Sequence, residues 1–204
     1  MATVSGALAL SHAIPELPLE RREQILGDAK NASNPLVREL FERFLPEKER
    51  RKTLGTQVDP DAILGSKGDA RRGRGVFFQE GGAQCHTCHR VNGQGTEFGP
   101  DLAQSIRKYD RAQLLEQILH PSKVIDPQFA GVSVETAEDL YTGYIVRRSE
   151  KELVLRMAGG QEKTLPAARV TRMAQQQVSL MPDGLLQGLT AQEAADLLEF
   201  LRTL

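Results

Sequence analysis

Residues 68–102 read GDARRGRGVFFQEGGAQCHTCHRVNGQGTEFGPDL, a helix-like run that leads into two cysteines. Cys85 and Cys88 stand three positions apart, and His89 follows the second thiol directly. A C-x-x-C-H run of this kind is the attachment signature for c-type haem. Two thiols at this spacing on a turn can add to both vinyl groups of one porphyrin, which leaves the next histidine under the iron. The motif therefore predicts one covalent haem c with His89 as an iron ligand.

Other uses of the two cysteines stay open but are less favoured. A structural zinc site needs four converging ligands, usually as two separated pairs, whereas His12 and His120 are isolated in the sequence. A thioredoxin-like redox pair is expected in a βαβ context, and here a helix-like segment precedes the motif. The chain has only two cysteines, so a framework of several disulfides is excluded.

The second axial ligand of the iron is the harder prediction. Met157 and Met173 lie in strand-like runs, where apolar packing is the usual role of methionine. Met181 lies in the irregular stretch SLMPDGLL, and a thioether that reaches the iron is expected to come from such a loop. We therefore predict Met181 as the distal ligand, with His120 as the rival candidate. Ligation by His and Met fills both axial positions, which favours electron transfer over catalysis.

Helical patterns surround this motif. In the second predicted helix, Asn34 is a suitable N-cap and Pro35 suits the first helical position. The segment EKERRK that follows is expected to be a solvated helix face, and residues 54–67 are expected to be a connector. The first two predicted helices cover residues 17–32 and a stretch that starts at 34 and ends by 53. Three more are predicted over residues 69–80, 111–119 and 190–204.

Residues 129–177 have a different pattern. Short β-branched or alternating runs such as YTGYIVRR and ELVLRM are separated by turn residues. They predict four or five antiparallel strands in a small barrel or curled sheet. Two sets of residues are candidate docking surfaces for a redox partner. For the set in the strands, the alternative is that the sheet only shields one edge of the haem. For the arginine set, the alternative is a solvated helix face. These sets are Tyr141, Tyr144, Arg147 and Arg148, and Arg71, Arg72 and Arg74.

Composition excludes several other classes of function. The formal net charge of −1 gives no sign of nucleic-acid binding, and neither does the absence of tryptophan. No run approaches the roughly 20 apolar residues that span a bilayer. The opening MATVSGALALSHA lacks the basic start of a secretory signal, so no export signal is visible, and a domain from a longer parent protein is expected.

Residues 68–102 resemble the start of a class I cytochrome c domain. In that family a helical glycine and an aromatic residue precede the haem, and Gly73 and Phe77 match them. The resemblance implies that the Pro100 carbonyl accepts a hydrogen bond from Nδ1–H of His89 and so orients the ligand. Class I cytochromes also have a Met-Pro pair before the last helix, as Met181 and Pro182 are here.

The chain from about residue 34 onward is similar to one more specific family, the haem-binding domain of planctomycete-type and verrucomicrobial multidomain proteins. The similarity implies neighbouring helical-repeat or dehydrogenase-like domains. It rests on the segments FERFLPEKERRKTLG, CHTCH, GPDL, LLEQILHPSKVIDPQF, SLMPDGL and LTAQEAADLLEFLRTL.

Together these observations predict a mainly α chain with the class I cytochrome c helical fold. We expect a helical extension over residues 1–60 and a cytochrome c domain over 61–204, with a β-rich insertion at 129–177. The expected function is electron transfer, without catalysis, between a dehydrogenase-type partner or parent domain and a respiratory acceptor in the periplasm. The alternative is a haem-based ligand sensor or an enzyme with a displaceable sixth ligand.

Overall fold

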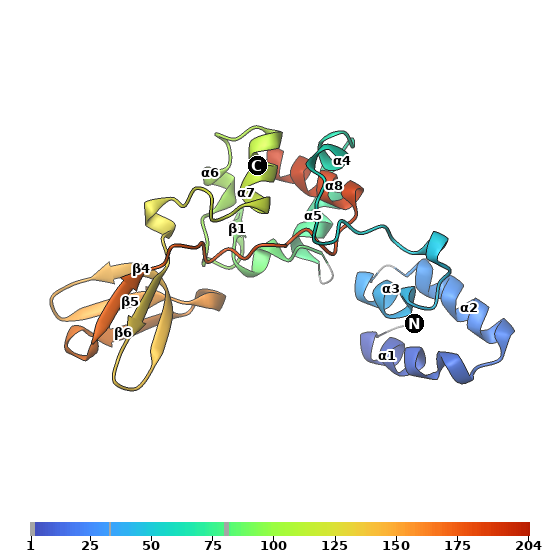
Figure 1. Ribbon diagram of the computed structural model, residues 1–204, viewed down its shortest axis with the longest axis horizontal. Coiled ribbons are helices and arrows are strands. Elements are labelled where there is room, and N and C mark those ends of the chain that lie inside the picture. Colours follow the sequence, from blue (N-terminus) through green and yellow to red (C-terminus); the bar gives the residue numbers. More distant parts are fainter. Residues whose placement is uncertain (1–2, 33, 80–81) are drawn as a thin grey trace.

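The protein has three parts that follow one another in space much as they do along the chain (Figure 1). The computed structural model describes residues 3–32, 34–79 and 82–204. Within these described residues, three helices form the N-terminal part. A second group of helices, which includes the last one, forms the central part, and a five-stranded sheet lies at the far end from the N-terminus (Figure 1).

The N-terminal helices are α1 (Val4–Ala13), α2 (Leu19–Lys30) and α3 (Pro35–Glu42). As predicted, Asn34 caps α3, because its side chain accepts a hydrogen bond from the backbone N–H of Leu36. The sequence pattern does not reveal α1, whose small residues give no clear amphipathic stripe. The core of this part consists of Ala7, Ile14, Ile25, Ala29, Val37 and Phe41.

The prediction of a helix across EKERRK is wrong. Only a 3₁₀ turn, η2 (Glu47–Glu49), forms there, directly after Pro46. The chain then runs extended beside the segment that precedes the last helix, because Leu54 N–H donates to the carbonyl of Leu189 at 2.8 Å. Arg51 forms an ion pair with Glu193 in the same place. Tertiary contacts therefore override the local helical preference of these charged residues.

The described residues of the central part form five helices. The predicted helices at 69–80, 111–119 and 190–204 are confirmed as α5, α7 and α8, although residue 80 lies outside the described residues. The predicted connector at 54–67 contains an unpredicted short helix, α4. The bounds are α4 (Pro60–Leu64), α5 (Ala70–Phe78), α6 (Leu102–Ser105), α7 (Arg111–Leu119) and α8 (Ala191–Arg202).

Helices α5 and α8 cross at very short range. A Cβ atom built on Gly73 would lie 1.9 Å from the carbonyl oxygen of Asp196, and one on Gly68 would lie 2.3 Å from that of Ala195. Only glycine permits two helix backbones to approach this closely. The crossing seals one side of the largest hydrophobic core, where the rings of Phe77 and Phe200 meet edge to face with centroids 5.5 Å apart.

The sheet of β3–β7 is antiparallel throughout and lies within the region where strands are predicted. The strand order is β6-β5-β4-β3-β7, so the last strand returns to pair with the first. The chain as a whole is mixed, with helices and antiparallel strands, rather than purely helical. The strands are β3 (Val132–Glu135), β4 (Leu140–Arg148), β5 (Glu152–Arg156), β6 (Glu162–Pro166) and β7 (Arg172–Gln175).

Short elements complete the described chain. A two-stranded ribbon, β1 (Arg90–Val91) with β2 (Gln94–Gly95), follows the CHTCH motif. The 3₁₀ turns are η1 (Ile14–Glu16), η2, η3 (Cys85–Thr87), η4 (Pro127–Phe129), η5 (Ala158–Gly160) and η6 (Ala167–Arg169). In the described part of the chain, no helix combines the length and apolar character required to cross a membrane.

Candidate haem-binding site

The CHTCH motif forms a tight turn. Cys85 begins η3, and the backbone N–H of His89 donates to the carbonyl of Cys85 at 2.8 Å. Gln84 enters the turn in a left-handed conformation, with φ of 50°. No disulfide joins Cys85 and Cys88, and the turn places both beside His89. This is the arrangement that the sequence predicts for covalent attachment of a porphyrin.

His89 has one ring nitrogen engaged by the backbone. Its Nδ1 lies 2.9 Å from the carbonyl oxygen of Pro100, and the bond fits Nδ1–H as donor, which leaves Nε2 free as a ligand. Burial lowers the pKa of His89, and the bond to Pro100 opposes that shift. The neutral imidazole that results is the form that binds metal ions.

The Pro100 carbonyl is held in place by the preceding turn. The backbone N–H groups of Phe98 and Gly99 both donate to the carbonyl of Cys88, at 3.0 and 2.7 Å. A Cβ atom on Gly99 would lie 2.6 Å from Cε1 of His89, so only glycine leaves room for the ring. The loop and the motif therefore form one rigid unit around the histidine.

A regular helix over the CHTCH motif would turn the side chain of His86 away from the protein, but in the structure this side chain contacts the end of α5. Nδ1 of His86 lies 3.1 Å from the carbonyl oxygen of Phe77, and its ring packs against Phe78 with centroids 5.7 Å apart. The motif is a 3₁₀ turn rather than a regular α-helix, so side-chain directions estimated from α-helical geometry do not apply. His86 fastens the motif to the end of α5.

One cavity of about 520 Å³ lies beside the motif. Cys85, Cys88, His89, Pro100 and Met181 all line it, so the five site residues predicted from the sequence meet in one place. Its wall is otherwise largely apolar, with contributions from α5, α7 and α8. These wall residues include Phe77, Phe98, Leu102, Ile106, Leu114, Ile118, Phe129, Tyr144, Leu185, Leu186, Leu197 and Leu201.

Met181 reaches the cavity from an irregular loop. Its backbone N–H donates to Oγ of Ser179 at 3.1 Å, and the N–H of Ser179 donates to Oγ of Ser122 at 3.1 Å. These bonds tie the methionine loop to the segment that follows α7. His120, the rival ligand, is the exposed C-cap of α7 and does not line the cavity. Met173 packs instead against the core of the sheet.

The cavity also has polar groups that suit the carboxylates of a haem. Oγ of Ser105 is buried in the wall without a hydrogen-bond partner in the described part of the chain. Lys108 and Tyr109 line the same cavity. A largely apolar pocket with a few polar groups is the usual form of a cofactor site. The residues present therefore fit a porphyrin, and these three polar residues have no motif that sequence analysis could have recognised.

Burial disfavours the thiolate form of Cys85. Burial raises the pKa of Cys85 to about 12, which leaves almost no thiolate at neutral pH. The thiolate is the nucleophilic form of cysteine, so the folded chain does not activate this sulfur by itself.

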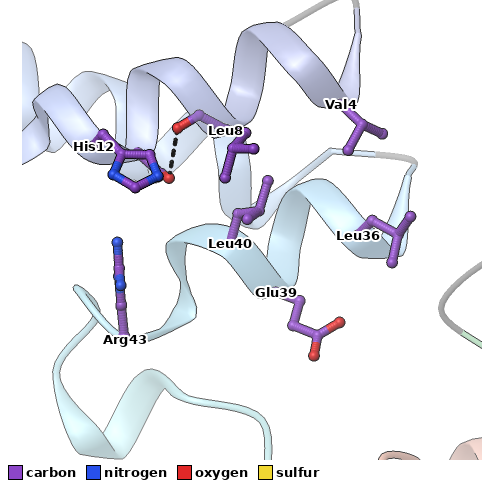
Figure 2. A pocket seen from close by; sticks show the side chains of 8 residues that line it. Val4, Leu8, His12, Leu36, Glu39, Leu40 and Arg43 are labelled. Atoms are coloured by element: carbon purple, nitrogen blue, oxygen red, sulfur yellow. Dashed lines mark hydrogen bonds between the residues drawn. The ribbon is translucent and has the colours of Figure 1, made fainter.

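A second cavity, of about 420 Å³, lies between α1 and α3 (Figure 2). The side chains of Leu8 and Leu40 lie close together in it, and Arg43 points toward His12 (Figure 2). Among the described residues, no group of three or more His, Cys, Asp or Glu side chains could hold a metal ion. The described residues of this cavity therefore do not indicate a metal site.

The structure changes the interpretation of both candidate docking surfaces. In the basic set, Arg72 forms an ion pair with Asp196 across the α5–α8 crossing, and Arg74 packs over the ring of Phe78. In the other set, Tyr144 is only 8% exposed and lines the cavity, so it cannot present a surface to a partner. Arg147 forms an ion pair with Glu152 within the sheet.

Comparison with known proteins agrees with this site. The family model of cytochrome c matches residues 70–133. Cytochrome c-555 of Methylococcus capsulatus is 35% identical over 68 residues, which are 33% of this chain and 54% of that protein. The chain thus matches about half the length of this curated relative. Residues 70–133 are therefore the segment of this chain that is similar to cytochrome c.

Proposed function

We propose that this chain is a monohaem c-type cytochrome that transfers electrons. The observation that supports the proposal is that Cys85, Cys88, His89 and Met181 all line the same, largely apolar cavity. Two thiols on one turn suit covalent attachment, and an imidazole and a thioether suit the two axial positions of an iron. With both positions filled by protein atoms, no site remains open for a substrate.

Each residue has a separate task in this proposal. Haem, when bound, supplies a one-electron iron couple. Cys85 and Cys88 would hold the haem through thioether links, and Nε2 of His89 would bind the iron. The Pro100 carbonyl fixes the tautomer of His89 through Nδ1–H. The sulfur of Met181 would be a second protein ligand of the iron, and a thioether ligand would stabilise the reduced state. The apolar wall keeps water away from the cofactor.

Further parts of the proposal concern organisation and partners. We assign the chain to the planctomycete-type and verrucomicrobial haem-binding domain, with an N-terminal extension over 1–60 and a cytochrome c domain over 61–204. Residues 129–177 form an insertion in that domain. The electron donor is a dehydrogenase-type partner or parent domain, the acceptor is a respiratory cytochrome, and the site of action is the periplasm.

The substitution Met181→Ala tests the axial ligand. In the matured protein we expect loss of the Met–iron charge-transfer absorption of the ferric state, a high-spin spectrum and ready binding of cyanide. The reduced-to-oxidised ratio at a fixed ambient potential is expected to fall at least tenfold, because a soft sulfur ligand favours ferrous iron. Met173→Ala is the matched control, since Met173 packs on the sheet core, and its spectrum is expected to match that of the wild type.

Two results would count against the proposal. A chain that shows no covalent haem by staining on a denaturing gel, after expression with the cytochrome maturation machinery, is not a c-type cytochrome. A wild-type protein that is already high-spin and binds carbon monoxide readily has an open sixth position. That second result would favour the alternative function, a haem-based sensor or enzyme with a displaceable ligand.

A further inference from the structure

The sheet of β3–β7 lies directly against the loop that positions His89. A chain of ion pairs joins the two: Arg156 on β5 bonds Glu97 at 3.3 Å, Glu97 bonds Arg90 at 3.2 Å, and Arg90 bonds Asp101 at 3.4 Å. Asp101 directly follows Pro100, whose carbonyl oxygen lies 2.9 Å from Nδ1 of His89. Positive and negative side chains therefore alternate from β5 to Asp101. Asp101 is the residue after Pro100, whose carbonyl orients His89.

A backbone contact supports the same junction. Gly160, in the turn between β5 and β6, has a φ of 76°, and a Cβ atom there would lie 2.8 Å from Cγ2 of Thr96. The backbone N–H of Thr96 in turn donates to the carbonyl of His86 at 2.9 Å. The turn therefore rests on residues that are bonded to the CHTCH motif.

Tyr144 on β4 is the third contact and the most deeply placed. Its ring lies between two aromatic rings, with centroids 4.9 Å from Phe98 and 5.8 Å from Phe129. Only 8% of the residue is exposed, and it lines the cavity with Cys88, although it belongs to the sheet. No hydrogen bond to its hydroxyl occurs within the described residues. The ring, rather than the hydroxyl, therefore accounts for the position of Tyr144.

The contact with Phe98 connects Tyr144 to the histidine. The N–H of Phe98 donates to the carbonyl of Cys88, and Phe98 lies two residues before Pro100. A ring that fixes Phe98 restricts the turn that ends at the Pro100 carbonyl. Groups that orient a metal-bound histidine typically change metal affinity or activity by 10–100-fold when they are removed.

We propose that Tyr144 is a positioning residue of the haem site, and that the sheet acts as a clamp on the loop of residues 96–101 through Tyr144 and Arg156. This inference rests on the proposed function for its consequence at the iron. The sheet is then a part of the redox site rather than a separate module. Loss of the contacts that the sheet makes with this loop loosens the His89–Pro100 bond and exposes the cofactor to water. Both effects change the midpoint potential of the haem.

Amide hydrogen exchange of the matured protein tests the clamp without relying on electron transfer. With Tyr144→Ala, the amides of Phe98 and Gly99 are expected to exchange at least tenfold faster, while those of α7 keep their wild-type rates. Loss of global stability would instead accelerate exchange in both places. Tyr144→Phe keeps the ring and is expected to restore slow exchange. Ile145→Ala, at the next and more exposed position of β4, is the matched control.

A second variant tests the ionic half of the clamp. Arg156→Gln is expected to accelerate exchange at Phe98, whereas Arg147→Gln, which breaks only the Arg147–Glu152 pair within the sheet, is expected to leave it unchanged. Tyr144→Ala is also expected to change the reduced-to-oxidised ratio at a fixed potential by about tenfold, or about 59 mV for a one-electron couple.

The outcomes separate this inference from the proposed function. A folded, haem-loaded Tyr144→Ala protein with wild-type exchange at Phe98 and Gly99 and an unchanged potential overturns the clamp but leaves the cytochrome intact. A matured wild-type chain without covalent haem overturns the proposed function. Exchange that rises equally in α7 and at Phe98 assigns Tyr144 to general stability and also overturns the positioning role.

Discussion

Gly73→Ala is expected to destabilise the haem-loaded protein by about 3 kcal/mol, at the upper end of the cost of overpacking a core. The added Cβ would lie 1.9 Å from the carbonyl oxygen and 2.4 Å from the carbonyl carbon of Asp196, and 2.8 Å from Cβ of Phe200. Two of these atoms belong to the backbone of α8 and cannot rotate away. Helices α5 and α8 must therefore separate by more than 1 Å, which opens the core around Phe77 and Phe200.

Urea unfolding followed by far-ultraviolet circular dichroism measures this effect. Gly75→Ala is the matched control, because it lies on the same helix and its Cβ would meet only the flexible side chain of Gln79, at 3.3 Å. Alanine is a better helix former than glycine, so Gly75→Ala is expected to be neutral or to stabilise by about 0.5–1 kcal/mol. Equal unfolding free energies for the two variants would show that the helix crossing does not depend on Gly73.

Asp196→Asn is expected to cost about 2 kcal/mol of stability at neutral pH. The carboxylate of Asp196 is buried on α8 and accepts two hydrogen bonds from Arg72, at 2.6 and 2.8 Å. It also accepts bonds from Gln192 and from the backbone N–H of Asp69. Hydrogen bonds to charged groups contribute about 1.5–3 kcal/mol, but the side chain of Arg72 is largely exposed, so solvent screening reduces its share.

The effect of Asp196→Asn is expected to depend on pH. Burial alone would raise the pKa of Asp196, but the hydrogen bonds from Arg72, Gln192 and Asp69 outweigh burial and lower it. A lowered pKa in the folded state means that the carboxylate stabilises the protein fully above the unfolded value of about 3.9. This contribution is lost as the pH falls through the lower folded value.

Unfolding free energies at several pH values check this prediction. The difference between wild type and Asp196→Asn is expected to be constant from pH 7 to about pH 5 and to shrink below about pH 4. Glu199→Gln is the control on the same helix, since Glu199 forms only an i,i+3 pair with the half-exposed Arg202. Its cost is expected to stay within about 0.5 kcal/mol. A constant difference down to pH 2 would show that Asp196 is not stabilised as a carboxylate.

Local signals in the sequence were sufficient for much of the chain. The helix at 111–119 is confirmed at its predicted limits, because the Asp110 and Gln113 capping box at its start and Pro121 beyond its end are both local features. Residues Cys85 to His89 are contiguous, so their proximity needs no tertiary information. The alternation in the segments of β4 and β5 likewise predicts antiparallel strands, since side chains of a strand point to opposite faces in turn.

Other features depend on contacts between residues far apart in the chain. The residues of the segment EKERRK favour a helix, yet the chain is extended at Arg51. The side chain of Arg51 pairs there with Glu193, which lies near the C-terminal end of the chain. Ser105 has no motif of its own, and its place in the cavity wall follows only from how α6 packs. Tyr144 looks like a surface residue of a strand, but the placement of the sheet turns its ring into the cavity.

The sequence by itself therefore predicted the candidate cofactor, two candidate attachment residues, one candidate axial histidine and most of the helices and strands, because each of these predictions rests on neighbouring residues. The tertiary structure brings Met181 and Pro100 to the cavity of His89, as the sequence predicts. It alone decided that Asp196 pairs with Arg72 and that Tyr144 joins the sheet to that cavity. Burial and close packing are sums over many distant contacts, and no local pattern encodes them.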